Sequence, residues 1–188
     1  MKNRCFWATN DPLYIAYHDT EWGVPVRDEQ KMFEFLILET FQAGLSWITI
    51  LKKRENFRKA FDQFDYRKIA LYSEEKYESL LQDAGIIRNK LKIKAAIHNA
   101  QKFIEIQEEY GSFCAYIWSF VDGKPLQNSW ESKATVPATT PLSDTVSKAL
   151  KAKGFKFVGS TVIYAHMQAT GMVNDHTTDC FRYLEVQS

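Results

Sequence analysis

Apolar residues recur at helical spacing along most of this 188-residue chain, and sustained alternation of period two is absent. Ser and Asp residues stand before several of these segments, where they are suited to cap helix N-termini. The pattern predicts an all-α fold. Its first helices are expected to begin after Asp28, Ser46, Asp65 and Ser73.

The second half of the chain continues the helical pattern. A long amphipathic helix is expected after Gly85, because Ile93, Ile97, Ala100 and Ile104 fall on one face. A short aromatic helix follows Gly111-Ser112, and residues 123–142, which hold three prolines, are expected to form an exposed loop. The last two helices are predicted at about Ser143–Lys153 and between Gly159 and Gly171.

Length and composition favour one ordinary globular unit. We predict a single domain over residues 1–188, with a formal net charge of only +1 that excludes a uniformly basic coat. No apolar stretch is long enough to span a membrane, and the N-terminal residues lack a signal-peptide core. Three cysteines are a poor disulfide framework, so we expect reduced thiols and a cytoplasmic protein.

Four residues near the two ends of the chain have the types and spacing of a metal site. Cys5 and His18 lie near the N-terminus, and His176 and Cys180 form a His-x3-Cys pair near the C-terminus. Two thiolates and two imidazoles would complete a tetrahedral Zn²⁺ and leave no position for water, which is typical of a structural site. The alternative is a buried free thiol with surface histidines.

The segment QDAGIIRNKLKIK at residues 82–94 has the pattern of two helices joined by a glycine-containing turn. Backbone amides after Gly85, together with the positive start of the next helix, would form a phosphate cradle. Five cations and no acid lie between Gly85 and Ile104, and a second cationic group follows later in the chain. The first group is Arg88, Lys90, Lys92, Lys94 and Lys102, and the second is Lys148, Lys151, Lys153 and Lys156. The alternative is a solvated helix face after a glycine cap.

Glu39 is the most unusual acid in the sequence. It shares one helix side with Met32, Phe35 and Leu36, and a carboxylate on an apolar stripe needs a partner when it is buried. Glu34 faces elsewhere and is expected to be solvated. Glu39 is therefore either a functional anion or part of a structural salt bridge or helix-end hydrogen bond.

Four long strings resemble the bacterial 3-methyladenine DNA glycosylase I family. They are DPLYIAYHDTEWGVP, LETFQAGLSWITILKKRENF, DAGIIRNKLKIKAAI and LKAKGFKFVGSTVIYAHMQATGMVNDH, and the likeness runs from Cys5 to Cys180. The resemblance implies a helix-hairpin-helix glycosylase fold, with two lobes flanking a base pocket and the hairpin near residues 73–104. It also implies one structural zinc ion, held by Cys5, His18, His176 and Cys180, and no organic cofactor.

The family hydrolyses the N-glycosidic bond of 3-methyladenine in DNA and so initiates base-excision repair. The resemblance implies that Glu39 and Tyr17 contact the base, that Trp47 stacks on it, and that Trp7 and Trp22 form pocket walls. The expected partner is alkylated double-stranded DNA in the bacterial nucleoid, bound by a monomer. The tight loop at residues 42–45 would let Leu45 wedge into the duplex; the alternative is that Leu45 packs beneath the turn. The expected DNA-contacting residues are Gly44, Leu45, Gly85, Arg88, Asn89 and Lys90.

Two positions depart from what related enzymes suggest. No catalytic Asp follows the hairpin by about twenty residues, as in many helix-hairpin-helix glycosylases, and the 3-methyladenine glycosylase I family also lacks it. Thr40 stands where Gly or Ser is expected beside Glu39, so it is expected to narrow the pocket. The competing functions are a non-catalytic, zinc-stapled DNA-binding module and, less favoured, a metallohydrolase with an open zinc site.

Overall fold

The computed structural model describes residues 2–8 and 10–187 of the chain. This part is mainly helical, as expected, with one pair of two-residue strands. The α-helices are α1 (Pro12–Thr20), α2 (Glu29–Gln42), α3 (Trp47–Ala60), α4 (Tyr66–Ile69), α5 (Glu74–Gln82), α6 (Lys90–Tyr110), α7 (Phe113–Trp118), α8 (Pro141–Ala152), α9 (Ser160–Ala169) and α10 (Arg182–Glu185). Short 3-10 helices cover Asp62–Phe64, Ser119–Val121 and Lys133–Thr135.

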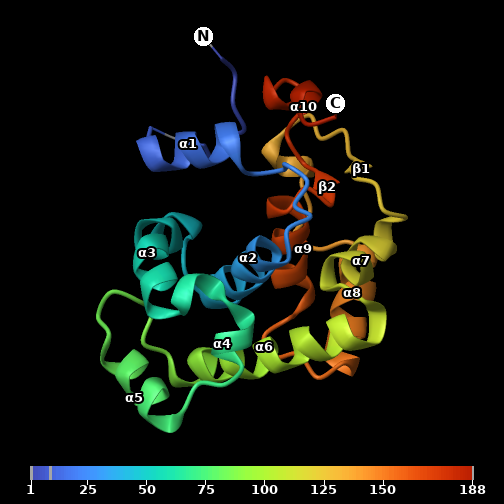
Figure 1. Cartoon of the computed structure of the whole chain (residues 1–188). Helices are drawn as coiled ribbons and strands as arrows, with labels where there is room; N and C mark the ends of the chain where they lie inside the picture. The colour runs from blue at the N-terminus through green and yellow to red at the C-terminus, as the bar shows by residue number, and fades with distance from the viewer. Residues whose placement is uncertain (1, 9, 188) are drawn as a thin grey trace.

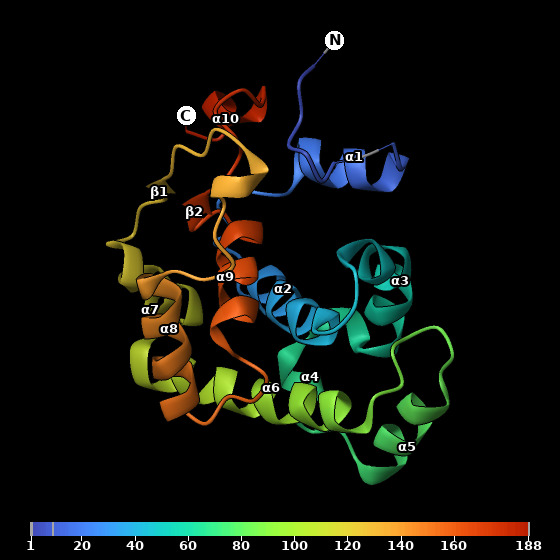
Figure 2. The same cartoon turned by 180° about the vertical axis from the view of Figure 1, so that it is seen from behind.

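Helix α2 is the centre of the molecule. It packs against α3, α6 and α9, and every residue from Met32 to Phe41 is buried. Figures 1 and 2 show α2 and α9 in the middle, with α1 and α10 at one end and α5 and α6 at the other. None of the helices in the described residues is long and apolar enough to cross a membrane. The two acids in this buried stretch, Glu34 and Glu39, are therefore surrounded by protein.

Local signals explain where α2 begins and ends. The Asp28 carboxylate accepts a hydrogen bond from the Lys31 backbone N–H at 2.8 Å, as an N-cap does. Beyond the C-terminus of the helix, Gly44 has φ of +80°, a conformation that favours glycine. The Lys92 ammonium of α6 donates hydrogen bonds to the carbonyls of Phe41 at 2.9 Å and Ala43 at 2.6 Å. The end of α2 is thus held by the long helix.

The predicted pair of helices around residues 82–94 is present as α5, a turn, and α6. Asn89 caps α6 by accepting a hydrogen bond from the Lys92 N–H at 3.0 Å, and Gly111 ends it with φ of +83°. The stretch where other glycosylases would carry an Asp is therefore continuous helix.

Several elements differ from the sequence-based expectation. Helix α1 was not predicted, although Asp11 accepts from the Leu13 N–H and Pro12 occupies the first turn. The expected exposed loop at 123–142 contains strand β1 (Leu126–Gln127), which pairs in parallel with β2 (Val173–Asn174). Helix α8 begins at Pro141 rather than Ser143, because Thr140 is its N-cap.

The expectation that Glu34 is solvated was wrong. Glu34 is 7% exposed, and one carboxylate oxygen accepts from Arg54 Nε at 2.6 Å and from Arg58 Nη2 at 2.8 Å. Arg54 also binds both carboxylate oxygens of Glu21, just after α1, at 3.0 Å. This ion-pair network joins α1, α2 and α3.

We predict that Glu34→Ala lowers the free energy of unfolding by about 3 kcal/mol, because breaking a buried ion pair leaves a charge poorly compensated. Glu55→Ala is the matched control, since Glu55 also pairs with Arg58 but its side chain is 72% exposed. It is expected to change the free energy by less than about 0.5 kcal/mol. Urea denaturation of both variants measures the difference, and equal losses would contradict a buried network.

Candidate active site and metal centre

A cavity of about 300 Å³ lies between α1, α2, α3 and α9. Side chains from six separate segments of the chain line it, and aromatic rings predominate. The lining residues are Phe6, Trp7, Tyr14, Tyr17, Trp22, Glu39, Gln42, Trp47, Val136, Pro137, Ala165, Gln168 and Asp175. All five residues expected to contact the base are therefore brought together around one cavity.

Glu39 enters the cavity from the last turn of α2. It is 4% exposed, and among the described residues no side chain forms a hydrogen bond or ion pair with its carboxylate. Burial raises the pKa of Glu39 to about 8, because water is removed without a compensating charge. The salt-bridge alternative is thus contradicted, since the buried Arg54 is bound to Glu34 and Glu21 instead.

Tyr17 and Trp47 flank Glu39 in the cavity lining. Tyr17 is buried on α1, and its ring centroid lies 5.6 Å from that of Trp47, the first residue of α3. Burial, followed by the charge of Glu39, raises the pKa of the Tyr17 phenol, so its hydroxyl stays a hydrogen-bond donor. The Trp47 indole N–H is buried and has no hydrogen-bond partner within the described residues. A buried donor without a partner is uncommon and marks a position where a ligand can bind.

Trp7 and Trp22 form another part of the lining. Their ring centroids are 4.9 Å apart in an edge-to-face arrangement, and Trp7 contacts Tyr14 in the same way at 5.4 Å. Such contacts fix each ring against its neighbour. The lining is therefore a set of mutually packed aromatic rings beside the carboxylate of Glu39.

Asp175 also lines the cavity, and the sequence reasoning missed it. It is 2% exposed, and its carboxylate accepts hydrogen bonds from four donors. These are Asn128 at 2.7 Å, Trp130 at 2.8 Å, Tyr164 at 2.5 Å and Gln168 at 2.8 Å. Because its oxygens are occupied, Asp175 serves to join the 128–130 segment to α9. Its only signal in the sequence is its position next to His176.

A groove of about 410 Å³ adjoins the cavity and shares Gln42, Pro137, Ala165 and Gln168 with it. Ala43 and Gly44 line one part of this groove, and Thr161 and Val162 from the first turn of α9 line another. Leu45, the expected wedge, is 39% exposed beside it, and its N–H donates to the Gln42 carbonyl at 2.7 Å. The loop that follows α2 is thus well ordered and presents an apolar side chain to solvent.

The hairpin presents Arg88, Asn89 and Lys90 to solvent, as expected. The Gly85 N–H donates a hydrogen bond to the Asp83 carboxylate at 2.7 Å. This amide therefore closes the turn and is not available to a phosphate. A Cβ at Gly85 would lie 2.9 Å from the same carboxylate oxygen, so the close turn requires glycine. Lys92, counted among the surface cations, is buried and holds the end of α2.

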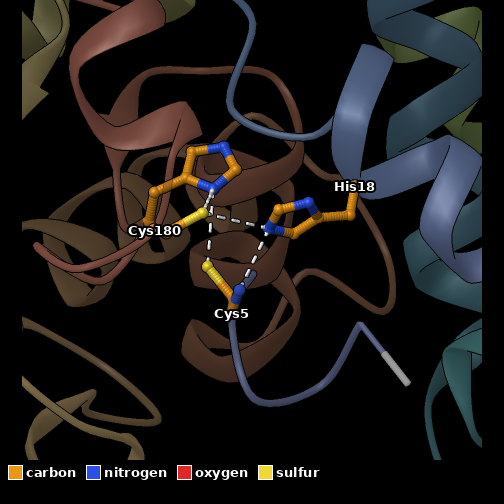
Figure 3. A group of neighbouring side chains, drawn as sticks. Cys5, His18 and Cys180 are labelled. Atoms are coloured by element: carbon orange, nitrogen blue, oxygen red, sulfur yellow. Dashed lines mark hydrogen bonds between the residues drawn. The ribbon is translucent and has the colours of Figure 1, made fainter. Parts of the chain in front are cut away.

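Cys5, His18, His176 and Cys180 form one buried cluster, and their ligand atoms all lie within 4.8 Å of one another. Figure 3 shows Cys5, His18 and Cys180 pointing toward a common centre. The Sγ of Cys180 lies 3.4 Å from His18 Nε2 and 3.5 Å from His176 Nδ1. Ligands held at 2.0–2.3 Å from a tetrahedral zinc ion are about 3.5 Å apart, so the donor set and spacing fit such a metal.

Both histidines of the cluster are held by contacts outside it. The second ring nitrogen of His18 contacts the Asp19 carboxylate at 2.8 Å, and Asp19 is bound by Arg4. The second ring nitrogen of His176 lies 3.0 Å from the carbonyl of Trp22, a cavity residue. Outer contacts of this kind orient metal-binding imidazoles. His18 also directly follows Tyr17, so the cluster and the cavity share their support.

Thr40 does not narrow the cavity as expected. It is fully buried, it is not part of the lining, and its hydroxyl donates to the Leu36 carbonyl at 2.9 Å. The side chain therefore packs within the protein beside α2.

The arrangement suits a flat, positively charged ring. Aromatic faces provide stacking and cation–π attraction, and an unpaired carboxylate in a low-dielectric cavity attracts a cation far more strongly than it would in water. A neutral ring lacks that charge interaction. The cavity therefore selects by charge as well as by shape.

Comparison with known proteins gives one consistent result. Residues 7–183 match the family model described as methyladenine glycosylase. The chain is 52% identical over 180 residues to DNA-3-methyladenine glycosylase 1 of Escherichia coli (strain K12), an alignment that covers 96% of each chain.

Solved structures agree with the sequence comparison. A crystal structure of 3-methyladenine DNA glycosylase I is similar with a TM-score of 0.93 and 55% identity, over 95% of this chain and 98% of that one. A second, from Staphylococcus aureus and concerned with 3-methyladenine recognition, has a TM-score of 0.92 and 36% identity over 96% of each chain.

We predict that Glu39→Gln stabilises the protein above pH 8 and has little effect at pH 5. A carboxyl whose folded pKa is about 8 and whose usual pKa is 4.5 favours the folded state at low pH, and this contribution is lost as pH rises through 8. The expected gain at pH 9 is about 2–4 kcal/mol. Thermal melts at pH 5 and pH 9 measure it. The exposed Glu78→Gln is the control, and a pH-independent effect of Glu39→Gln would contradict the assignment.

Proposed function

The chain belongs to the methyladenine glycosylase family, and from this premise we propose that it acts on alkylated DNA through the cavity around Glu39. It is a DNA glycosylase that hydrolyses the N-glycosidic bond of 3-methyladenine and so initiates base-excision repair. The observation that carries the proposal is a buried carboxylate without a partner, surrounded by aromatic rings.

Glu39 and Tyr17 are proposed to contact the extruded base. The carboxylate of Glu39 accepts hydrogen bonds from the base edge, and the Tyr17 hydroxyl holds another edge. In the free protein, Glu39 has no positive group beside it. The cationic base supplies that positive charge, so base binding favours the ionised form of the carboxylate. Trp47 stacks on the base, and Trp7 and Trp22 complete the walls.

The chemistry requires little acid catalysis. Methylation at N3 gives adenine a positive charge, so it already leaves the sugar readily when the glycosidic bond breaks. Water attacks the sugar carbon, and the products are free 3-methyladenine and an abasic site in the DNA. The protein therefore contributes positioning, charge and exclusion of bulk water.

DNA binding is proposed to use two surface elements. Arg88, Asn89 and Lys90 of the hairpin contact phosphate groups without reading the sequence, which suits a net charge of +1. Gly44 and Leu45 enter the space that the extruded base vacates. We expect a single domain with two lobes, acting as a monomer on double-stranded DNA in the bacterial cytoplasm.

We further propose that the four-residue cluster binds one structural zinc ion. All four positions are filled by protein atoms, so the metal would join the N-terminal segment to the C-terminal one and would not activate water. A metallohydrolase with an open site is therefore disfavoured. A non-catalytic binding module is disfavoured because it requires a salt-bridged Glu39 and a closed aromatic core.

Base release tests the enzymatic proposal. Wild-type protein is expected to release 3-methyladenine from methylated duplex DNA, and Glu39→Gln is expected to lower the rate by about 100-fold, because the negative charge is removed. Chromatography of the released base measures the rate. Glu78→Gln is the exposed control and should match the wild type. A wild-type protein that binds the DNA and releases no base would reject the proposal.

For the metal, we expect a chelator to lower the melting temperature by about 10 °C or more, since the ion holds both chain ends in place. Cys180→Ser should melt at the lower temperature with or without chelator. Cys114→Ser removes a buried thiol outside the cluster and should keep the chelator response. Elemental analysis is expected to give one zinc per chain, and an unchanged melt of metal-free protein would contradict the structural role.

A further inference from the structure

The loop between α8 and α9 has an uncommon design. Phe155 and Val158 are buried and anchor it, whereas Lys156 and Phe157 between them are exposed. Phe157 is 40% exposed and has φ of +56°, in the left-handed region. A bulky residue rarely adopts this conformation, and exposing its ring to water is also unfavourable. The fold of the loop gains nothing evident from a phenylalanine here.

Among the described residues, the other non-glycine residues with positive φ differ from Phe157. They lie in the turns at Asp62–Phe64 and Asp122, and the aromatic one, Phe64, is fully buried. Phe157 is thus the exposed aromatic residue held in a strained backbone conformation. Strain of this sort persists where the surrounding structure enforces it, and it concentrates at functional sites.

The surrounding structure does enforce it. The Asn99 amide of α6 holds Lys156 twice, since its oxygen accepts from the Lys156 N–H at 2.8 Å and its nitrogen donates to the Lys156 carbonyl at 2.9 Å. His98 contacts the Gly154 carbonyl at 2.8 Å, and the Ser147 hydroxyl donates to the Val158 carbonyl at 2.6 Å. The tip of the loop is therefore fixed from both sides.

The same face of α6 holds the loop after α2. Lys92 and Asn99 are seven residues apart, which places them two turns apart on one side of the helix, about 10 Å along its axis. Lys92 binds the carbonyls of Phe41 and Ala43, and Asn99 binds Lys156. The helix that begins at the hairpin thus positions both loops. The groove beside the base cavity is lined by Ala43 and Gly44 of the first loop and by Thr161, just after the second.

Lysines lie in the second half of α8 and in the second loop that follows it. Lys148, Lys151 and Lys156 are exposed, while Lys153 is paired with Glu109 at 2.6 Å. These four lysines are the second cationic group of the sequence, and they lie outside the hairpin. Its position next to an exposed aromatic ring is the combination that nucleic-acid surfaces use, with charge for phosphate and a ring for the sugar or base.

We propose that the loop Gly154–Gly159 is a second DNA-contacting element, in which Phe157 packs against a nucleotide beside the extruded base and Lys156 faces a phosphate. The inference rests on the proposed glycosylase function. The damaged strand would lie along the groove, with the loop at Gly44–Leu45 and the loop at Lys156–Phe157 both contacting the duplex. Because the contact is made by stacking and charge, it carries no sequence preference.

Two substitutions of Phe157 separate a DNA contact from a structural role. Phe157→Ala removes the ring and keeps the strained backbone, whereas Phe157→Gly removes both. Phe157→Gly is therefore expected to melt a few degrees above Phe157→Ala. If the ring contacts DNA, both variants lose about tenfold in kcat/KM on methylated duplex DNA, the scale of one aromatic stacking contact. If the ring serves only the fold, activity follows stability and the Gly variant is the more active.

Binding of free 3-methyladenine, followed by tryptophan fluorescence, is expected to equal wild type in both variants, because the base cavity is untouched. Phe157→Tyr retains the ring and should restore the duplex activity. Leu184→Ala removes an exposed apolar side chain (72%) at the α10 end of the molecule and should behave as wild type. Wild-type duplex activity in Phe157→Ala would overturn this inference alone, whereas an inactive wild-type protein would overturn the proposed function.

Discussion

The structure depends on one carboxylate that is buried without a partner. Glu39 lies on the central helix, where every neighbouring position is also buried, and its pKa rises to about 8 as a result. The fold contains a buried arginine that would neutralise an acid, but Arg54 is bound by Glu34 and Glu21. That network keeps α1, α2 and α3 together and leaves Glu39 available. Burying an unpaired Glu39 lowers the stability of the fold when the carboxyl is ionised. The same unpaired carboxylate can attract a cation strongly.

The aromatic rings that line the cavity with Glu39 come from several segments of the chain, and three of them lie near residues of the Cys/His cluster. Trp7 follows Cys5, Tyr17 precedes His18, and Trp22 accepts at its carbonyl from the ring of His176. A metal bound by the four cluster residues would therefore also set the relative positions of the rings. It would hold a short N-terminal segment, of a kind that commonly frays, in place as part of the cavity wall.

The sequence predicted those features that local pattern encodes. Helix periodicity and caps located α2, α3, α5 and α6, and an acid on an apolar stripe identified Glu39. The incorrect expectations involve partners that only the tertiary structure supplies. Glu34 and Lys92 were expected to face solvent, but their partners lie 20 and about 50 residues away. Asp175 was missed because two of its four donors, Asn128 and Trp130, lie 47 and 45 residues away. Helix α1 was missed because its apolar face is weakly periodic.

Charge selection inside the cavity and DNA binding outside it use different physical means. In the proposed function, the cavity distinguishes a cationic base through the Glu39 carboxylate in a low-dielectric environment, which requires no cation on the surface. The duplex is uniform along its backbone, so a few lysines and exposed side chains on rigid loops are enough to hold it. Helix α6 links the two, since Lys92 fixes the end of the helix that carries Glu39 while the same helix begins at the hairpin. In the proposed function, a molecule with a net charge of +1 can therefore bind DNA where the loops lie, while the buried Glu39 carboxyl ionises as it meets a cationic base.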